Sequence, residues 1–134
     1  MFDRVLRSKT VVTPNSTSPA AIAIKNGIIE GIFPFDEVLE TKEDLTLIEA
    51  LLPGVVDTHV HINEPGRTEW EGFTTATNAA AAGGVTTLID MPLNSIPPTV
   101  SVDALKTKQA AAKDKCRVDV GFWGDRKSTR LNSS

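Results

Sequence analysis

Residues 53–61 read PGVVDTHVH, and this stretch decides the fold. The proline and glycine end the preceding segment, and the valine-rich run after them predicts a β-strand. Side chains two residues apart in a strand point to the same face, so Asp57, His59 and His61 would lie together there. In a helix, the two histidines would lie on nearly opposite sides. Neutral imidazole is a common zinc ligand, so the pattern predicts that His59 and His61 bind a metal ion.

The residues around this pair leave alternatives open. The two histidines could be polar residues on an exposed strand face. Asp57 could be a metal ligand, a partner that orients an imidazole, or a carboxylate bonded to nearby backbone. A hydrolytic metal site needs at least three protein ligands, and the chain has only these two histidines. The remaining ligands must therefore come from elsewhere.

A regular alternation of helix and strand patterns follows this strand. Residues 69–82 are rich in alanine and stop at two glycines, which predicts a helix, and residues 101–113 predict a second one. Residues 85–89 and 117–123 predict strands. This order is typical of parallel strands joined by crossover helices, so we predict an α/β fold for residues 53–124.

Polar residues follow the first two predicted strands of this series. In β/α barrels, active sites lie at the carboxyl ends of the strands. We expect Asn63 and Asn94 to bind substrate there, and Asp90 to orient a metal ligand. Asparagine is also favoured in turns, so Asn63 could be a turn residue. Most charges of the loop after the histidine pair are expected to be solvated: Glu64, Arg67, Glu69 and Glu71.

Residues 1–52 carry a different pattern, with short strand-like runs and many turn residues. Two such runs flank Asn26-Gly27. This arrangement predicts a β-hairpin, because a type I′ turn needs positive φ at both central positions. We therefore predict a partial β-sandwich domain over residues 1–52, with antiparallel pairing, ahead of the α/β part.

Composition and charge exclude several classes of protein. The chain has 134 residues, 40% hydrophobic and 23% charged, which is typical of folded domains. Its formal net charge of −3 argues against a dedicated binder of nucleic acid or of anionic membranes. One cysteine, Cys116, excludes an internal disulfide. No apolar run predicts a membrane span and no secretory signal is visible, so we expect a cytoplasmic protein.

The segment at 125–134, DRKSTRLNSS, differs from everything before it. It is polar and has neither a helix period nor a strand period. It resembles the translation of a sequencing adapter, and we expect it to be a non-native tail, with an ordinary flexible terminus as the alternative. The natural part of this chain would then be residues 1–124.

The motifs at 53–99 together resemble the amidohydrolase superfamily, whose barrels open on a Pro-Gly-x-x-Asp-x-His-x-His strand. The continuation over residues 61–99 reads HINEPGRTEWEGFTTATNAAAAGGVTTLIDMPLNSIPPT. It closely resembles the allantoinase family in the cyclic-amidohydrolase, or dihydroorotase-like, branch. Dihydroorotases typically have arginine at position 63, which can pair with a substrate carboxylate, whereas Asn63 suits a neutral ureido ring. The resemblance extends over residues 1–124.

This resemblance implies a β-sandwich domain and a metal-dependent (β/α)8 barrel with a binuclear centre, usually zinc. His59 and His61 match the ligands of its first strand. A bridging carboxylated lysine, two more histidines and a general-base aspartate would come from later strands, beyond this chain. The implied reaction opens the hydantoin ring of (S)-allantoin to give allantoate, in purine catabolism. The chain alone would hold only part of a barrel and no catalytic base, so we expect it to be inactive.

Two other interpretations remain open. The protein could be a cyclic amidohydrolase of the hydantoinase or dihydropyrimidinase type, or a genuine short binding module without catalysis. The resemblance implies a small-molecule substrate, allantoin, and a homo-oligomeric full-length protein, with no nucleic-acid or membrane partner. The compartment is expected to be the cytoplasm, with the peroxisome or mitochondrion as alternatives, because lineages place purine breakdown differently.

Overall fold

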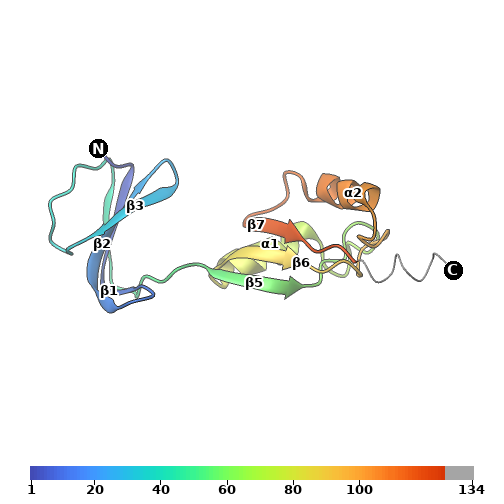
Figure 1. The fold of residues 1–134 in the computed structure, drawn as a ribbon, viewed down its shortest axis with the longest axis horizontal. Coiled ribbons are helices and arrows are strands. Elements are labelled where there is room, and N and C mark those ends of the chain that lie inside the picture. The colour runs from blue at the N-terminus through green and yellow to red at the C-terminus, as the bar shows by residue number, and fades with distance from the viewer. Residues whose placement is uncertain (126–134) are drawn as a thin grey trace. The chain divides into compact units, whose positions relative to one another are not determined.

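The computed structural model describes residues 1–125 in two compact units, Met1–Pro53 and the residues from Gly54 onward (Figure 1). Residues 126–134, nearly all of the expected non-native tail, lie outside the described residues. Within the described part of the chain, neither helix is long and apolar enough to cross a lipid bilayer.

The first unit is a four-stranded sheet in the order β3-β2-β1-β4. Its strands are β1 (Arg4–Val12), β2 (Thr17–Lys25), β3 (Ile28–Phe33) and β4 (Asp44–Leu47). Strands β1, β2 and β3 pair antiparallel, and the predicted Asn26-Gly27 turn is present, with φ of 52° and 76°. Strand β4 runs parallel to β1, so the prediction of wholly antiparallel pairing is wrong. The connection after β3 carries the chain to the opposite edge of the sheet, which local sequence patterns do not reveal.

This unit has a small apolar core and several ion pairs, one of them bidentate. Val5 on β1 is buried against the alanines of β2, under the side chains of Phe2 and Phe33. The guanidinium of Arg7 meets the carboxylate of Asp44 in a bidentate arrangement, with both N–O distances 2.8 Å. This ion pair joins β1 to the parallel strand β4 by side chains as well as by backbone.

The second unit is a three-stranded parallel sheet in the order β5-β6-β7, with helices connecting the strands. Its elements are β5 (Val55–Val60), α1 (Phe73–Ala82), β6 (Val85–Asp90), α2 (Val102–Ala112) and β7 (Asp119–Phe122). The predicted alternation of parallel strands and helices is confirmed. In Figure 1 the arrows of β5, β6 and β7 point the same way, so their carboxyl ends share one edge of the sheet.

Helix α1 begins at Phe73, four residues later than the sequence pattern predicts. The preceding residues form a closed loop, in which the Asn63 N–H donates to the Glu71 carbonyl at 2.9 Å. Gly72 then takes the cap position in an extended conformation. The tertiary pairing of this loop outweighs the weak helical preference of its residues.

The apolar core of this unit lies on one face of the sheet. Ile62, Phe73 and Leu88 are buried in it, and the rings of Phe73 and Phe122 meet edge to face with centroids 6.1 Å apart. Val60 packs on the same core. Because side chains alternate along a strand, the residues at 57, 59 and 61 face the opposite side. That side is where the predicted ligands lie.

Candidate active site

His59 lies at the carboxyl end of β5 and His61 directly follows the strand, and both face away from the apolar core. Their ring centroids are 5.1 Å apart with an interplanar angle of 62°, and both side chains are exposed. Asp57 shares the face, but its Oδ1 accepts the His59 backbone N–H at 3.0 Å. The described structure therefore shows Asp57 bonded to local backbone, one of the alternatives left open by the sequence.

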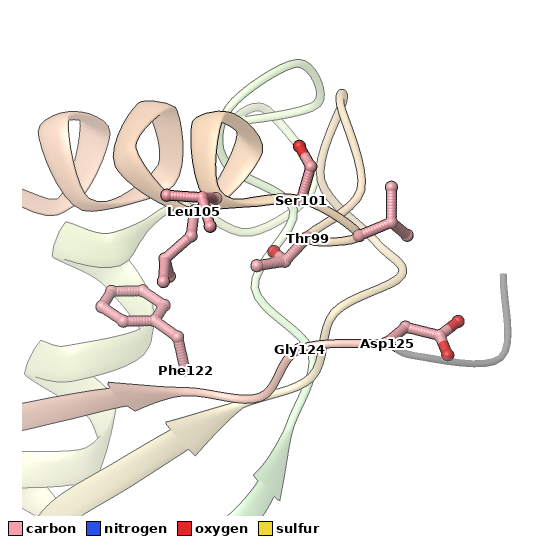
Figure 2. Close-up of a pocket in the computed structure, with 8 residues that line it drawn as sticks. Thr99, Ser101, Leu105, Phe122, Gly124 and Asp125 are labelled. Carbon is pink, nitrogen blue, oxygen red and sulfur yellow. The ribbon is translucent and has the colours of Figure 1, made fainter. Parts of the chain in front are cut away.

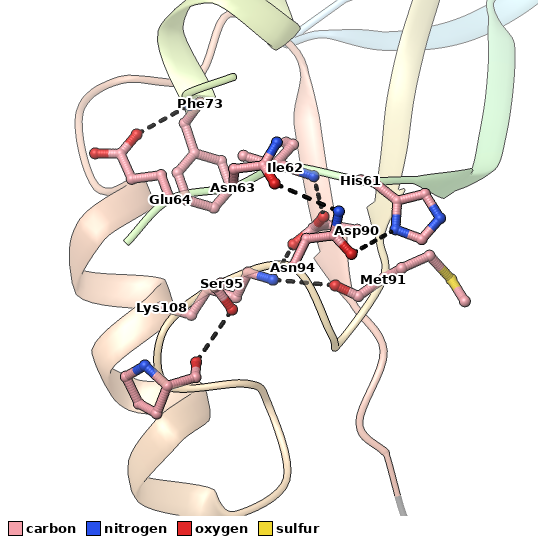
Figure 3. Close-up of polar contacts among 11 residues, drawn as sticks. His61, Ile62, Asn63, Glu64, Phe73, Asp90, Met91, Asn94, Ser95 and Lys108 are labelled. Atoms are coloured by element: carbon pink, nitrogen blue, oxygen red, sulfur yellow. Dashed lines mark hydrogen bonds and ion pairs between the residues drawn. The ribbon is translucent and has the colours of Figure 1, made fainter. Parts of the chain in front are cut away.

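The loop after β6 brings Asn94 to His61 (Figure 3). The Asn94 Oδ1 lies 3.1 Å from Nδ1 of His61, and the Asn94 Nδ2 donates to Oδ1 of Asn63 at 3.4 Å. An amide oxygen only accepts hydrogen bonds, so Nδ1 of His61 must donate in this contact. The lone pair of a neutral imidazole then sits on Nε2, where a metal ion can bind. Three residues predicted for the site are thus brought together.

Asp90 lies on the other side of the sheet from the histidine rings. It is fully buried, and its Oδ1 accepts the backbone N–H of Ile62 at 2.8 Å. Its Oδ2 forms an ion pair with Lys108 of α2, which is also buried. Burial raises the pKa of the Asp90 carboxyl, while Lys108 and the Ile62 N–H act in the opposite direction. Asp90 therefore hydrogen-bonds to the backbone next to His61, and the nearby His61 imidazole also lowers the pKa of the Asp90 carboxyl.

Two residues of this region were not identified as special by sequence reasoning. Lys108 sits between Ala104 and Ala112 on the buried face of α2, where an apolar residue would be expected. Glu64 was expected to be solvated but is only 6% exposed. Its Oε2 accepts the Phe73 N–H at 3.0 Å, and its Oε1 pairs with Lys115. The four-residue spacing of Lys108 from two buried alanines is the one sequence signal that could have revealed it.

The two histidines can be compared with the ligand set that a metal ion requires. Among residues 1–125 no group of three or more histidine, cysteine or acidic side chains is placed to hold a metal ion. Two imidazoles on one strand face, one with its Nδ1 already bonded, are nevertheless the donor type and arrangement that zinc uses. The residues present thus fit as one side of such a site.

An open cavity of about 400 Å³ lies elsewhere in the second unit, at the amino end of α2 (Figure 2). Thr99, Leu105 and Phe122 are among the residues that line it. None of the residues predicted for the site contributes to its wall. The candidate chemistry is therefore on the histidine face and not in this cavity.

The sequence of this chain is similar to that of known proteins. Residues 50–133 match the amidohydrolase family. The chain is 57% identical over 122 residues to an allantoinase from Streptomyces avermitilis, and 49% identical over 122 residues to a mitochondrial allantoinase from Aquarana catesbeiana. Each alignment covers 90% of this chain, but only 27% and 25% of those proteins. The chain thus spans about a quarter of the length of the curated relatives it matches.

A solved structure also superimposes on the chain. It is an L-hydantoinase (dihydropyrimidinase) from Arthrobacter aurescens, with a TM-score of 0.80 and 30% sequence identity. The superposition covers 92% of this chain and 28% of that structure. This structural similarity agrees with the fold described above.

Proposed function

The chain belongs to the amidohydrolase family, and from this premise we propose that it is the N-terminal part of an allantoinase. The proposed reaction is hydrolysis of the hydantoin ring of (S)-allantoin to allantoate. The observation that carries this proposal is the placement of His59 and His61 on one strand face, with Asn94 bonded to Nδ1 of His61. The similarity to allantoinases supports this substrate in particular.

His59 and His61 would hold the metal, for which we propose zinc in a binuclear centre completed by residues outside this chain. A bound metal ion supplies hydroxide at neutral pH and polarises the carbonyl under attack. Asn94 holds the ring of His61 in the tautomer that leaves Nε2 available. Asn63 and Asn94 lie beside the histidine pair, and their amide groups suit the uncharged C=O and N–H groups of a ureide ring.

We further propose the domain organisation that the sequence predicts. Residues 1–52 would be part of a β-sandwich domain, residues 53–124 the first units of a (β/α)8 barrel, and residues 125–134 a non-native tail. Sequencing the transcript across codon 124 tests the last point. A reading frame that continues past Gly124 without DRKSTRLNSS supports it, and an encoded tail followed by a stop codon favours a short binding module instead.

For the protein in the cell, we propose the cytoplasm as its compartment and a homo-oligomer as its state. Allantoin would be its small-molecule partner, without nucleic-acid or membrane partners. One similar allantoinase is mitochondrial by name, so fractionation of the source cells is the direct test of the compartment. Enzyme in a mitochondrial or peroxisomal fraction would contradict the cytoplasmic assignment.

The experiment for the activity uses the full-length protein with a panel of cyclic amides. We expect zinc-dependent opening of allantoin, with slower turnover of hydantoin and dihydrouracil and none of dihydroorotate. The hydantoinase-type alternative is favoured by the structural similarity to L-hydantoinase, and preferred turnover of hydantoin or dihydrouracil would establish it in place of the allantoinase. Allantoin hydrolysis by the 134-residue chain alone would contradict the expectation that this part is inactive.

A further inference from the structure

A buried ion pair lies beneath the carboxyl ends of β5 and β6. Asp90 is 0% exposed and Lys108 is 1% exposed, and Lys108 lies on the core-facing side of α2. Lys108 is four residues from each of two buried alanines, Ala104 and Ala112, so it occupies the centre of the helix's buried stripe. Two apolar side chains would fill this space without the cost of removing two charges from water.

The bonds of this pair converge on the backbone that carries the candidate site (Figure 3). Asp90 accepts the N–H of Ile62, the residue directly after His61, at 2.8 Å. Lys108 donates to the carbonyl of Met91, the residue directly after Asp90, at 3.1 Å. The Met91 N–H in turn donates to the Val60 carbonyl at 2.7 Å. One ion pair thus ties α2 to the ends of both strands.

The site residues leave the sheet at these same points. His61 immediately precedes Ile62, Asn63 immediately follows it, and Asn94 is three residues after Met91. Their mutual contacts are 3.1 Å and 3.4 Å, so a small slip of one loop against the other would break them. We propose that Lys108 and Asp90 are positioning residues, which hold His61 and Asn94 in register for metal binding. This inference rests on the proposed function for its metal.

The decisive variant is the full-length Asp90→Leu/Lys108→Met double variant. It fills the same buried space with apolar side chains and removes the hydrogen bonds to the Ile62 N–H and the Met91 carbonyl. We expect its melting temperature to stay near that of the parent while its zinc affinity, measured by chelator competition, falls at least 10-fold. The expected kinetic signature is a loss in kcat with a smaller change in KM. Lys106→Met is the matched control, since Lys106 is exposed on the same helix and should behave as the parent.

A readout in the metal-free protein separates this inference from the proposed function. Amide hydrogen exchange at Ile62 should be faster in the double variant than in the parent and in Lys106→Met. Parental zinc affinity together with parental Ile62 exchange in a folded double variant overturns the positioning role. Loss of zinc binding in the parent itself would instead contradict the proposed function, and the exchange measurement would still decide the positioning role.

The Asp90→Asn variant decides the question if the double variant fails to fold. It keeps the shape and the acceptor for the Ile62 N–H but removes the charge partner of Lys108. Weaker zinc binding at an unchanged melting temperature supports the positioning role, and parental zinc binding there overturns it. If Asp90→Asn also fails to fold, the ion pair is purely structural and the positioning role is overturned.

Discussion

Nδ1 of His61 lies 3.1 Å from the side-chain oxygen of Asn94, across a separation of 33 residues in the sequence. This contact fixes which ring nitrogen carries the proton, because an amide oxygen cannot donate. The amide itself is oriented by the bond from its nitrogen to Asn63. The ring of His61, which directly follows β5, is therefore oriented by the loop that follows β6.

Replacing Asn94 by leucine should weaken zinc binding by about 10- to 100-fold, since partners that orient a histidine ligand have effects of this size. Isothermal titration of the metal-free full-length protein measures it. Asn94→Asp keeps an acceptor for Nδ1 of His61, so its zinc affinity should fall less than that of Asn94→Leu. Asn78→Leu, at an exposed position of α1, is the control. Equal zinc affinity in Asn94→Leu and the parent would contradict the contact's role.

His59→Ala and His61→Ala should each abolish tight zinc binding, because each removes a ligand that the remaining donors cannot replace. Metal analysis after dialysis against a weak chelator measures the stoichiometry. Both residues are exposed in this chain, so the free energy of unfolding of the metal-free 134-residue chain should change by less than about 0.5 kcal/mol. Full zinc content in either variant would remove that histidine from the site.

Glu64→Ala should lower the free energy of unfolding by about 1–3 kcal/mol, because it leaves the buried Phe73 N–H without its acceptor. Urea denaturation followed by circular dichroism measures the change. Glu64→Gln keeps an acceptor for the Phe73 N–H, so its free energy of unfolding should fall less than that of Glu64→Ala. The exposed neighbour Glu69 provides the control, and Glu69→Ala should lie within about 0.5 kcal/mol of the parent. A parental value for Glu64→Ala would show that water replaces the carboxylate.

The Arg7–Asp44 pair should stabilise the first unit in a pH-dependent way. The hydrogen bond from Arg7 lowers the pKa of the Asp44 carboxyl from its ordinary value. A carboxyl with a lowered pKa in the folded state contributes stability above its unfolded pKa, and this contribution is lost as the pH falls through the folded value. Asp44 is 40% exposed at its side chain, so solvent screening limits the contribution to about 1 kcal/mol or less.

Asp44→Asn should therefore reduce the free energy of unfolding at pH 7 and have a smaller effect at pH 3. Urea titrations at both pH values measure the difference. Glu30→Gln on β3, an exposed carboxylate of the same sheet, is the control and should show little effect at either pH. An equal loss for Asp44→Asn at both pH values would mean that packing, and not charge, explains it.

Cys116 should react slowly with iodoacetamide in the folded protein. Burial raises the pKa of its thiol, and the negative charge of Glu64 adds to that rise, so less thiolate is present at pH 8 than for a free cysteine. Mass spectrometry after timed alkylation measures the rate. In urea the rate should rise to that of an unstructured peptide. Equal rates with and without urea would contradict the protected environment.

Local patterns predicted much of the second unit. The stop at Gly83-Gly84, the valine-rich runs and the serine before α2 all act within a few residues, and their elements are present. The start of α1 was misplaced because the loop after β5 closes on itself through Asn63 and Glu71. The direction of β4 was also wrong, since a strand's own residues do not specify which edge, or which direction, it takes in the sheet.

The sequence by itself determined that His59 and His61 share one face, because the two-residue period of a strand leaves no other arrangement. It also carried the motifs that place the chain in its family. Only the tertiary structure decided that Asn94 bonds to His61, that Glu64 is buried, and that Lys108 pairs with Asp90 beneath the strand ends. The physical reason is the distance along the chain over which each effect acts. Periodicity acts over neighbouring residues, whereas these contacts join segments that only the packing of helices on a parallel sheet brings together.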